Sequence, residues 1–144
     1  MLLMNFGSIL NFAEEIEGLD KVFYSNLTKN KKCIQHTELF SQFASDAKKN
    51  KKTIQKVRRE NVTEMILEGI ENFTKEPFYI KCGNPETMGF KDAIKTANKL
   101  ENRAKLYYIE AKEKLEALSE VARALKTLAK KRTEHLNRLD SISS

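Results

Sequence analysis

The stretch AEEIEGLDKVFY at residues 13–24 decides the fold, because it returns later in the chain as ANKLENRAKLYY at residues 97–108. The offset is a constant 84 residues, and each copy carries an alanine, a glutamate and an aromatic pair at matching positions. Apolar residues recur around both at three- and four-residue steps, the spacing of one helix face. The apolar stripes alone do not establish a repeat, because any two amphipathic helices align on their apolar stripes. A carboxylate on both stripes is more than periodicity requires, since charged residues rarely face a core unpaired.

A second pair of segments repeats in the same order at an offset of 85 residues: Phe40, Phe43, Ala44 and Ile54 align with Leu125, Leu128, Ala129 and Leu139. The periodicity predicts helices over residues 9–27, 37–59, 90–115 and 121–139, the last after a break near Ser119, each about 30 to 38 Å long. On the first helix the predicted apolar stripe is Ile9, Phe12, Ala13, Ile16, Leu19, Phe23 and Leu27.

Short connections within each half imply antiparallel hairpins. Residues 61–89 contain Pro77 and Pro85 and a short amphipathic stretch near their start (Val62, Met65, Ile66, Ile70 and Phe73), and form a long connection between the halves. No strict heptad persists, which excludes an extended coiled coil. The sequence therefore predicts an all-α, antiparallel four-helix bundle of two repeated hairpins in one domain, residues 1–144.

Composition limits the function classes. The chain is 40% hydrophobic and 32% charged, and its net charge of +6 favours acidic partners without choosing nucleic acid over phospholipid. Cys33 and Cys82 form no C-x-x-C motif, so we expect lone buried thiols in a reducing, cytoplasmic compartment rather than a zinc ribbon or disulfides. Residues 1–13 are too short and too interrupted for a membrane span, and do not read as a cleavable signal.

The repeated frame, A-x-x-x-E-x-x-x-x-x-[FY]-Y followed by [FL]-x-x-[FL]-A, resembles the rubrerythrin branch of the ferritin-like superfamily. In that family one Glu from the first helix of each hairpin and Glu-x-x-His from the second hold two iron ions. The resemblance places the single glutamates at Glu17 and Glu101, and the aromatic pairs at Phe23-Tyr24 and Tyr107-Tyr108. Core packing explains the aromatic pairs without any cofactor and is the favoured interpretation.

The Glu-x-x-His positions depart from that family. They fall on Ala47 and Asn50 in the first half and on Arg132 and His135 in the second, so three of the four ligands are missing. An arginine adds a fixed positive charge where metal would sit. We therefore expect Arg132 to pair with Glu17, Glu101 or both, as a core ion pair that replaces the metal. The alternative is that Arg132 extends to solvent and the glutamates are neutral or hydrogen-bonded to neighbouring polar groups.

His135 has two interpretations. It is a core histidine hydrogen-bonded to Glu101, or a surviving ligand of a vestigial metal site with Glu17 and Glu101. Glu134 points about 100° away on the helix and is expected at the surface.

A basic run without acidic residues consists of Lys48, Lys49, Lys51, Lys52, Lys56, Arg58 and Arg59. Together with Lys29, Lys31 and Lys32, this run is expected to make one end of the first hairpin basic. It is either a solvated helix face or a surface that contacts phosphates.

Three functions are consistent with these residues. The first is a degenerate rubrerythrin-like protein that has lost di-iron oxidase or peroxidase activity and acts as a structural or interaction protein, with no cofactor. The resemblance implies a homodimer. The second is a residual non-haem iron oxidoreductase of the rubrerythrin type, with di-iron or mononuclear iron at Glu17, Glu101 and His135. The third is a nucleic-acid-binding protein that uses the basic run.

Overall fold

The computed structural model describes residues 5–61 and 73–143, and every structural statement below concerns these residues. Four helices account for most of them: α1 (Phe6–Leu27), α2 (Thr37–Glu60), α3 (Phe90–Lys114) and α4 (Ser119–Ile142). Two short 3-10 helices, η1 (Lys31–His36) and η3 (Glu76–Phe78), lie in the connections. The described ranges contain no β-strand, which confirms the prediction of an all-α chain with four helices.

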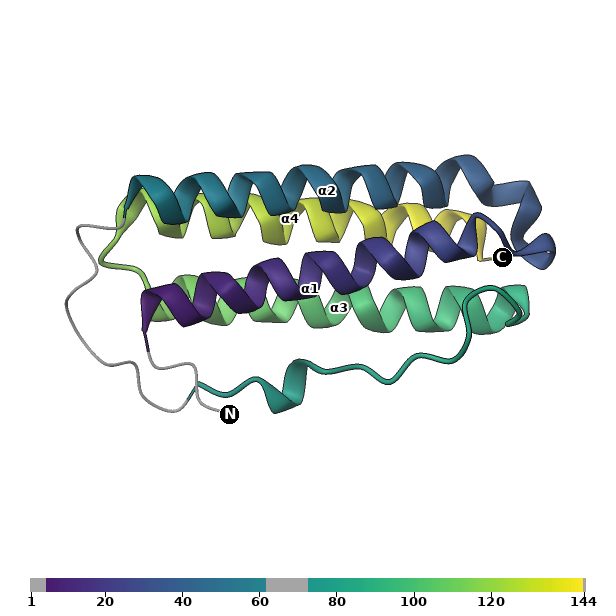
Figure 1. Cartoon of the computed structure of the whole chain (residues 1–144), viewed down its shortest axis with the longest axis horizontal. Coiled ribbons are helices and arrows are strands. Elements are labelled where there is room, and N and C mark those ends of the chain that lie inside the picture. The colour runs from purple at the N-terminus through teal and green to yellow at the C-terminus, as the bar shows by residue number, and fades with distance from the viewer. Residues whose placement is uncertain (1–4, 62–72, 144) are drawn as a thin grey trace.

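The helices form two antiparallel hairpins, α1 with α2 and α3 with α4, that pack into one bundle (Figure 1). α1 and α4 run in one direction, and α2 and α3 run in the other. α2 therefore ends at the opposite end of the bundle from the start of α3, and residues 73–89 follow the length of the bundle. Most of the amphipathic stretch expected near the start of this connection lies outside the described residues, apart from the buried Phe73.

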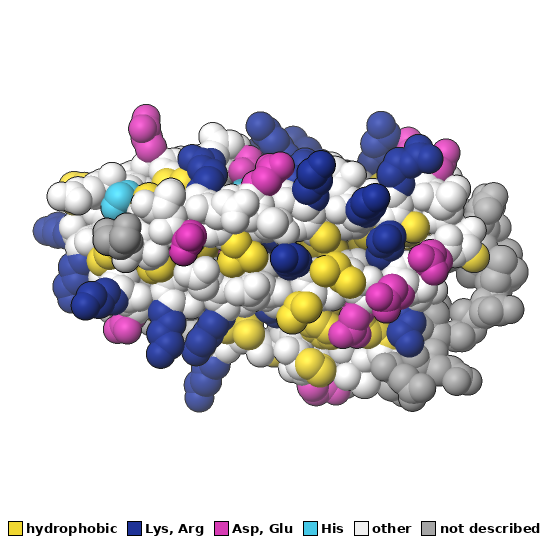
Figure 2. Space-filling view, turned by 180° about the vertical axis from the view of Figure 1, so that it is seen from behind, with side chains coloured by type: hydrophobic (Ala, Val, Ile, Leu, Met, Phe, Trp, Pro, Cys, Tyr) yellow, Lys and Arg dark blue, Asp and Glu magenta, His cyan; other side chains and the backbone are white. Residues whose placement is uncertain are grey.

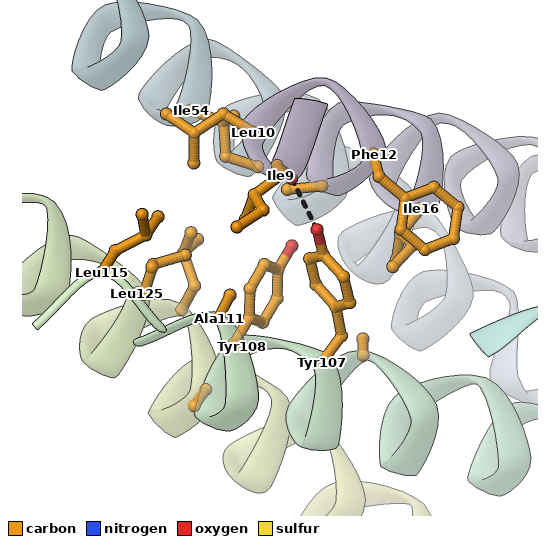
Figure 3. Packing of buried hydrophobic residues seen from close by; sticks show 14 of the residues in the cluster. Ile9, Leu10, Phe12, Ile16, Ile54, Tyr107, Tyr108, Ala111, Leu115 and Leu125 are labelled. Atoms are coloured by element: carbon orange, nitrogen blue, oxygen red, sulfur yellow. Dashed lines mark hydrogen bonds between the residues drawn. The ribbon is translucent and has the colours of Figure 1, made fainter. Parts of the chain in front are cut away.

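Two apolar clusters fill the bundle, one towards each end. The first contains the buried apolar residues between positions 6 and 16 of α1 and between 104 and 111 of α3, where Tyr107 and Tyr108 point from α3 towards α1 (Figure 3). The second contains the buried apolar residues between positions 23 and 27 of α1 and between 93 and 100 of α3. α2 and α4 also contribute to both clusters. Ile54 and Leu125 belong to the first, and Phe43 and Leu139 belong to the second. The middle of each helix lies between the clusters and carries polar residues there.

Local hydrogen bonds fix where the elements begin and meet. α1 starts with a capping box, in which Asn5 Oδ1 accepts from the Ser8 backbone N–H at 2.8 Å and Ser8 Oγ accepts from the Asn5 N–H at 3.1 Å. After α1, the buried Asn30 donates to the carbonyls of Pro85 and Met88 at 2.9 and 2.8 Å. These bonds tie the turn between α1 and α2 to the segment that leads into α3.

Three expectations from the sequence are wrong. Leu19 is 49% exposed and does not lie on the apolar stripe of α1, whereas Asp20, one residue later, is fully buried. The thiol of Cys82 is exposed, and only Cys33 is buried. Lys29, Lys31 and Lys32 do not share an end of the hairpin with Arg59, because a 24-residue α2, about 36 Å long, separates them.

No helix in residues 5–61 and 73–143 combines the length and the apolar character that a bilayer span requires.

A buried charge cluster as the candidate functional site

Six ionisable side chains meet between the two apolar clusters, and we call them the charge cluster: Glu17, Asp20, Glu101, Arg103, Arg132 and His135. Glu17 and Asp20 come from one face of α1, Glu101 and Arg103 from α3, and Arg132 and His135 from α4. The three carboxylates are 0% exposed and Arg132 is 1% exposed. Charges so deeply buried are unfavourable unless they are paired with each other.

Arg132 is the cation at the centre of this cluster. Its Nη2 lies 2.8 Å from Glu17 Oε2, and its Nη1 lies 2.9 Å from Asp20 Oδ2 and 3.0 Å from Glu101 Oε1. The structure therefore brings Arg132 to both glutamates, as the sequence suggests, and adds a third carboxylate. Arg132 Nη2 and Nε make no aligned hydrogen bond within the described chain. One guanidinium thus serves three carboxylates by short charge–charge contacts, and not through the bidentate fork that a single Arg–carboxylate pair would form.

Arg103 is the second buried cation, and it was not identified from the sequence. Its Nη2 pairs with Asp20 Oδ1, its Nη1 donates to the Phe78 carbonyl at 3.2 Å, and its Nε donates to the Leu100 carbonyl at 3.3 Å. Phe78 belongs to η3, so the connection before α3 covers Arg103 and holds it against α1. Asp20 is consequently shared between Arg103 and Arg132.

Neutral donors complete the coordination of the two glutamates. Tyr24 donates its hydroxyl to Glu101 Oε2 at 2.5 Å, and Tyr108 donates to Glu17 Oε2. Asn50 Nδ2 donates to Glu17 Oε1 at 3.2 Å. The second residue of each aromatic pair, a tyrosine in both, thus belongs to the site. Tyr107 instead donates to the Ile9 carbonyl at 2.6 Å and packs within the apolar cluster (Figure 3).

His135 connects the charge cluster to the surface. Its Nδ1 lies 3.1 Å from Glu101 Oε1, its Nε2 lies 2.8 Å from Asp46 Oδ2, and its ring stacks on Phe43 at a centroid distance of 3.8 Å. Ionised carboxylates only accept hydrogen bonds, so both ring nitrogens must carry protons and the ring is an imidazolium. Burial lowers the pKa of His135, but Glu101 and Asp46 outweigh it and the net shift is upward. The contact with Glu101 is the one expected of a core histidine, whereas Asp46 was not expected.

The charges of the cluster balance. Three carboxylates face two guanidiniums and one imidazolium, so the buried group is neutral when His135 is protonated. Burial raises the pKa of Asp20 to about 6, although Arg132 and Arg103 oppose the shift. Burial acts on Glu101 in the same direction, but Arg132, His135 and Tyr24 overcome it and lower its pKa to about 2. At neutral pH both groups are therefore ionised and paired.

The remaining positions of the family frame lie at the same level of the bundle. Ala47 and Asn50 are buried on α2, beside Arg132 and His135 on α4, while Glu134 is exposed. Within the described ranges no three His, Cys, Asp or Glu side chains are arranged to hold a metal ion. Arg132 lies within 3.0 Å of both Glu17 and Glu101, so these donors do not fit a di-iron centre.

The basic run of α2 is partly neutralised by the fold. Arg58 pairs with Glu14 of α1 at 2.5 Å, and Lys56 lies 3.9 Å from Glu60. Lys48, Lys49 and Lys52 are exposed along α2, whereas Lys51 is half-buried.

The fold and the site together define an all-helical bundle of two hairpins with a neutral, buried charge cluster at its middle. Comparison with protein-family models, with curated proteins and with solved structures found no match to this chain.

Proposed function

We propose that this chain is a metal-free relative of the rubrerythrin-like, ferritin-like proteins, in which Arg132 takes the position of the metal and the bundle acts as a structural or interaction protein. The observation that carries the proposal is the guanidinium of Arg132, which lies within 3.0 Å of carboxylates from α1 and α3. Cation and carboxylates here belong to one chain, so the bundle needs no ion to neutralise its interior.

The chain path supports the proposed relationship. In the ferritin-like arrangement, two hairpins are joined by a long connection, and the ligands project from the middle of all four helices. Here residues 73–89 run along the bundle (Figure 1), and Glu17, Ala47, Glu101 and Arg132 all lie between the two apolar clusters.

Electrostatics explains why such a site would not take iron. A guanidinium keeps its charge throughout the range in which proteins fold. Two unit charges 4 Å apart interact by about 4 kcal/mol at an effective dielectric of 20, so a divalent ion at that distance from Arg132 would be opposed by about 8 kcal/mol. His135 adds a further positive charge, because both of its nitrogens are committed to carboxylates.

The test is to measure iron and then to restore the missing ligands. We expect the native chain, incubated with Fe²⁺ in air, to bind no stoichiometric iron and to show no near-ultraviolet oxo-iron absorption. The variant Ala47→Glu/Asn50→His/Arg132→Glu should bind about two iron ions if the frame is correct. The matched control Ala47→Glu/Asn50→His keeps Arg132 and should stay free of iron. Stoichiometric iron in the native chain would overturn the proposal in favour of the oxidoreductase.

An interaction role needs an accessible surface, and the chain offers one beside α1 and α3. Val22 and Leu106 are 59% and 55% exposed, and a groove of about 270 Å³ lined by Leu19, Val22 and Ile80 separates α1 from residues 80–85. On the face shown in Figure 2, hydrophobic side chains also form a band between rows of charged ones. Exposed apolar surface of this kind suits protein contacts, and we propose self-association into a homodimer. Light scattering should give twice the chain mass for the native protein and a monomer for Val22→Glu, with Val22→Ala as the control. A native monomer would overturn this part.

A further inference from the structure

A second polar site lies in the seam between α2 and α4, and it borders the charge cluster at Asn50 and His135. It is a cavity of about 190 Å³, lined by three cations (Lys49, Lys131 and Arg138), two acids (Asp46 and Glu134) and two inner residues (Asn50 and His135). At about 30 Å³ per water molecule, this volume holds roughly six waters or one small polar molecule.

The cations of this seam cavity outnumber the acids that are free to neutralise them. Asp46 is already engaged, because it contacts His135 Nε2 at 2.8 Å and accepts from Gln42 at 2.8 Å. Arg138 lies over the Phe43 ring at 5.6 Å. Within the described chain Lys49, Lys131 and Arg138 have no ion-pair partner, and Glu134 alone opposes them. The unpaired charge at this cavity is therefore positive, which favours an anion.

The inner wall of the cavity needs a hydrogen-bond donor, whereas its cationic side chains need a negative charge. Asn50 is 1% exposed, and its Nδ2 donates to Glu17 Oε1, which fixes the orientation of the amide. Its Oδ1 is buried and accepts no hydrogen bond from any described residue. A buried acceptor without a donor is costly, so the group that fills the cavity should donate a hydrogen bond to this oxygen.

We propose that the seam cavity binds a protonated oxyanion, hydrogen phosphate or a phosphate monoester, with its charged oxygens on Lys49, Lys131 and Arg138 and its hydroxyl donating to Asn50 Oδ1. Phosphate suits the site because it combines negative charge with an O–H group near neutral pH, where its second pKa is about 6 to 7. Sulfate has the same shape and a full charge but carries no proton. The Asn50 acceptor therefore selects phosphate over sulfate. This inference does not depend on the function proposed for the charge cluster.

The test is isothermal titration of the whole chain with inorganic phosphate, with sulfate as the matched anion, at about pH 6, where inorganic phosphate carries a proton and about half of a phosphate monoester does. We expect saturable phosphate binding, with sulfate at least about tenfold weaker, since one hydrogen bond to a charged group is worth about that factor. Methyl phosphate in a parallel titration distinguishes a phosphate monoester from free phosphate as the natural ligand. Tighter binding than inorganic phosphate indicates a monoester, and weaker binding indicates the free ion.

Variants of side chains outside the charge cluster, the half-buried Lys131 and the exposed Arg138, locate the site without disturbing the buried charges. Lys131→Gln and Arg138→Gln should each weaken phosphate binding about tenfold, whereas Lys52→Gln, an exposed lysine of α2 outside the cavity, should change it less than about twofold. Equal affinity for phosphate and sulfate, or equal loss in all three variants, would show only diffuse charge attraction and overturn the proposal. Binding of duplex DNA without saturable phosphate binding would also overturn it, in favour of an extended nucleic-acid surface.

Discussion

Replacing Arg132 by methionine is the most direct test of how the bundle tolerates its buried acids. The substitution keeps a long, unbranched side chain and removes the cation that lies 2.8 Å from Glu17, 2.9 Å from Asp20 and 3.0 Å from Glu101. Asp20 retains Arg103, and Glu101 retains His135. Glu17 is left with only the neutral donors Tyr108 and Asn50.

The expected loss of stability follows from the partners that the three carboxylates keep. Removing one partner of a buried ion pair costs about 3 to 5 kcal/mol, because the other charge stays buried without compensation. We expect Arg132→Met to lower the free energy of unfolding by about 4 kcal/mol at neutral pH, a large share of the roughly 5 to 15 kcal/mol typical of a domain. Unpaired buried carboxylates have raised pKa values, so the stability they contribute is present at low pH and lost as the pH rises. The deficit of the variant should therefore shrink as the pH falls.

Urea denaturation followed by far-ultraviolet circular dichroism measures this, with Arg123→Met as the control for an exposed arginine on the same helix. Adding Glu17→Gln to Arg132→Met removes the uncompensated charge and should recover about half of the loss. Two results would refute the reasoning: an Arg132→Met protein as stable as Arg123→Met, or a deficit that does not change with pH.

Three further predictions come from the same cluster. Folding raises the pKa of Asp20 from 3.8 to about 6, so its contribution of about 3 kcal/mol is present below about pH 4 and lost as the pH rises through 6. As the pH rises across that range, the urea midpoint should fall less steeply for Asp20→Asn than for the native chain. Identical slopes would mean that Asp20 does not cause this pH dependence. Asp46→Asn should lower the pKa of His135 in an NMR titration, because it removes one of the two carboxylates that raise that pKa; no change would mean that the two side chains are not paired in solution. Tyr24→Phe deletes a buried donor and should cost about 1 to 2 kcal/mol in urea denaturation, against less than about 0.5 kcal/mol for Tyr79→Phe, whose side chain is 48% exposed. Equal losses in the two phenylalanine variants would contradict the role assigned to Tyr24.

The four helices were predictable because each carries its own three- and four-residue apolar period, a local property of the sequence. The short helices η1 and η3 were not, because segments of six and three residues are too short to show a period. The repeat at residues 13–24 and 97–108 placed Glu17 and Glu101 correctly at the bundle centre, since a carboxylate on an apolar stripe is visible in the sequence.

The position of Asp20 is equally visible in the sequence. It lies three residues after Glu17 and four before Tyr24, on the same helix face, whereas the predicted stripe contains Leu19 in its place. Arg103 and Asp46 could not have been found in this way. Arg103 is buried because Phe78 and its neighbours cover it, and Asp46 reaches His135 only because α2 packs beside α4. Both contacts are made between segments far apart in the chain, which periodicity does not report.

The polar layer between the two apolar clusters sets the lengthwise register of the helices. In a bundle that is apolar from end to end, one helix can slide past its neighbour by a turn of about 5.4 Å and still bury similar side chains. Here such a slide of α4 would carry Arg132 away from three acids and place it against leucines or aromatic rings. The three acids and the arginine therefore fix α1, α3 and α4 at a single axial alignment.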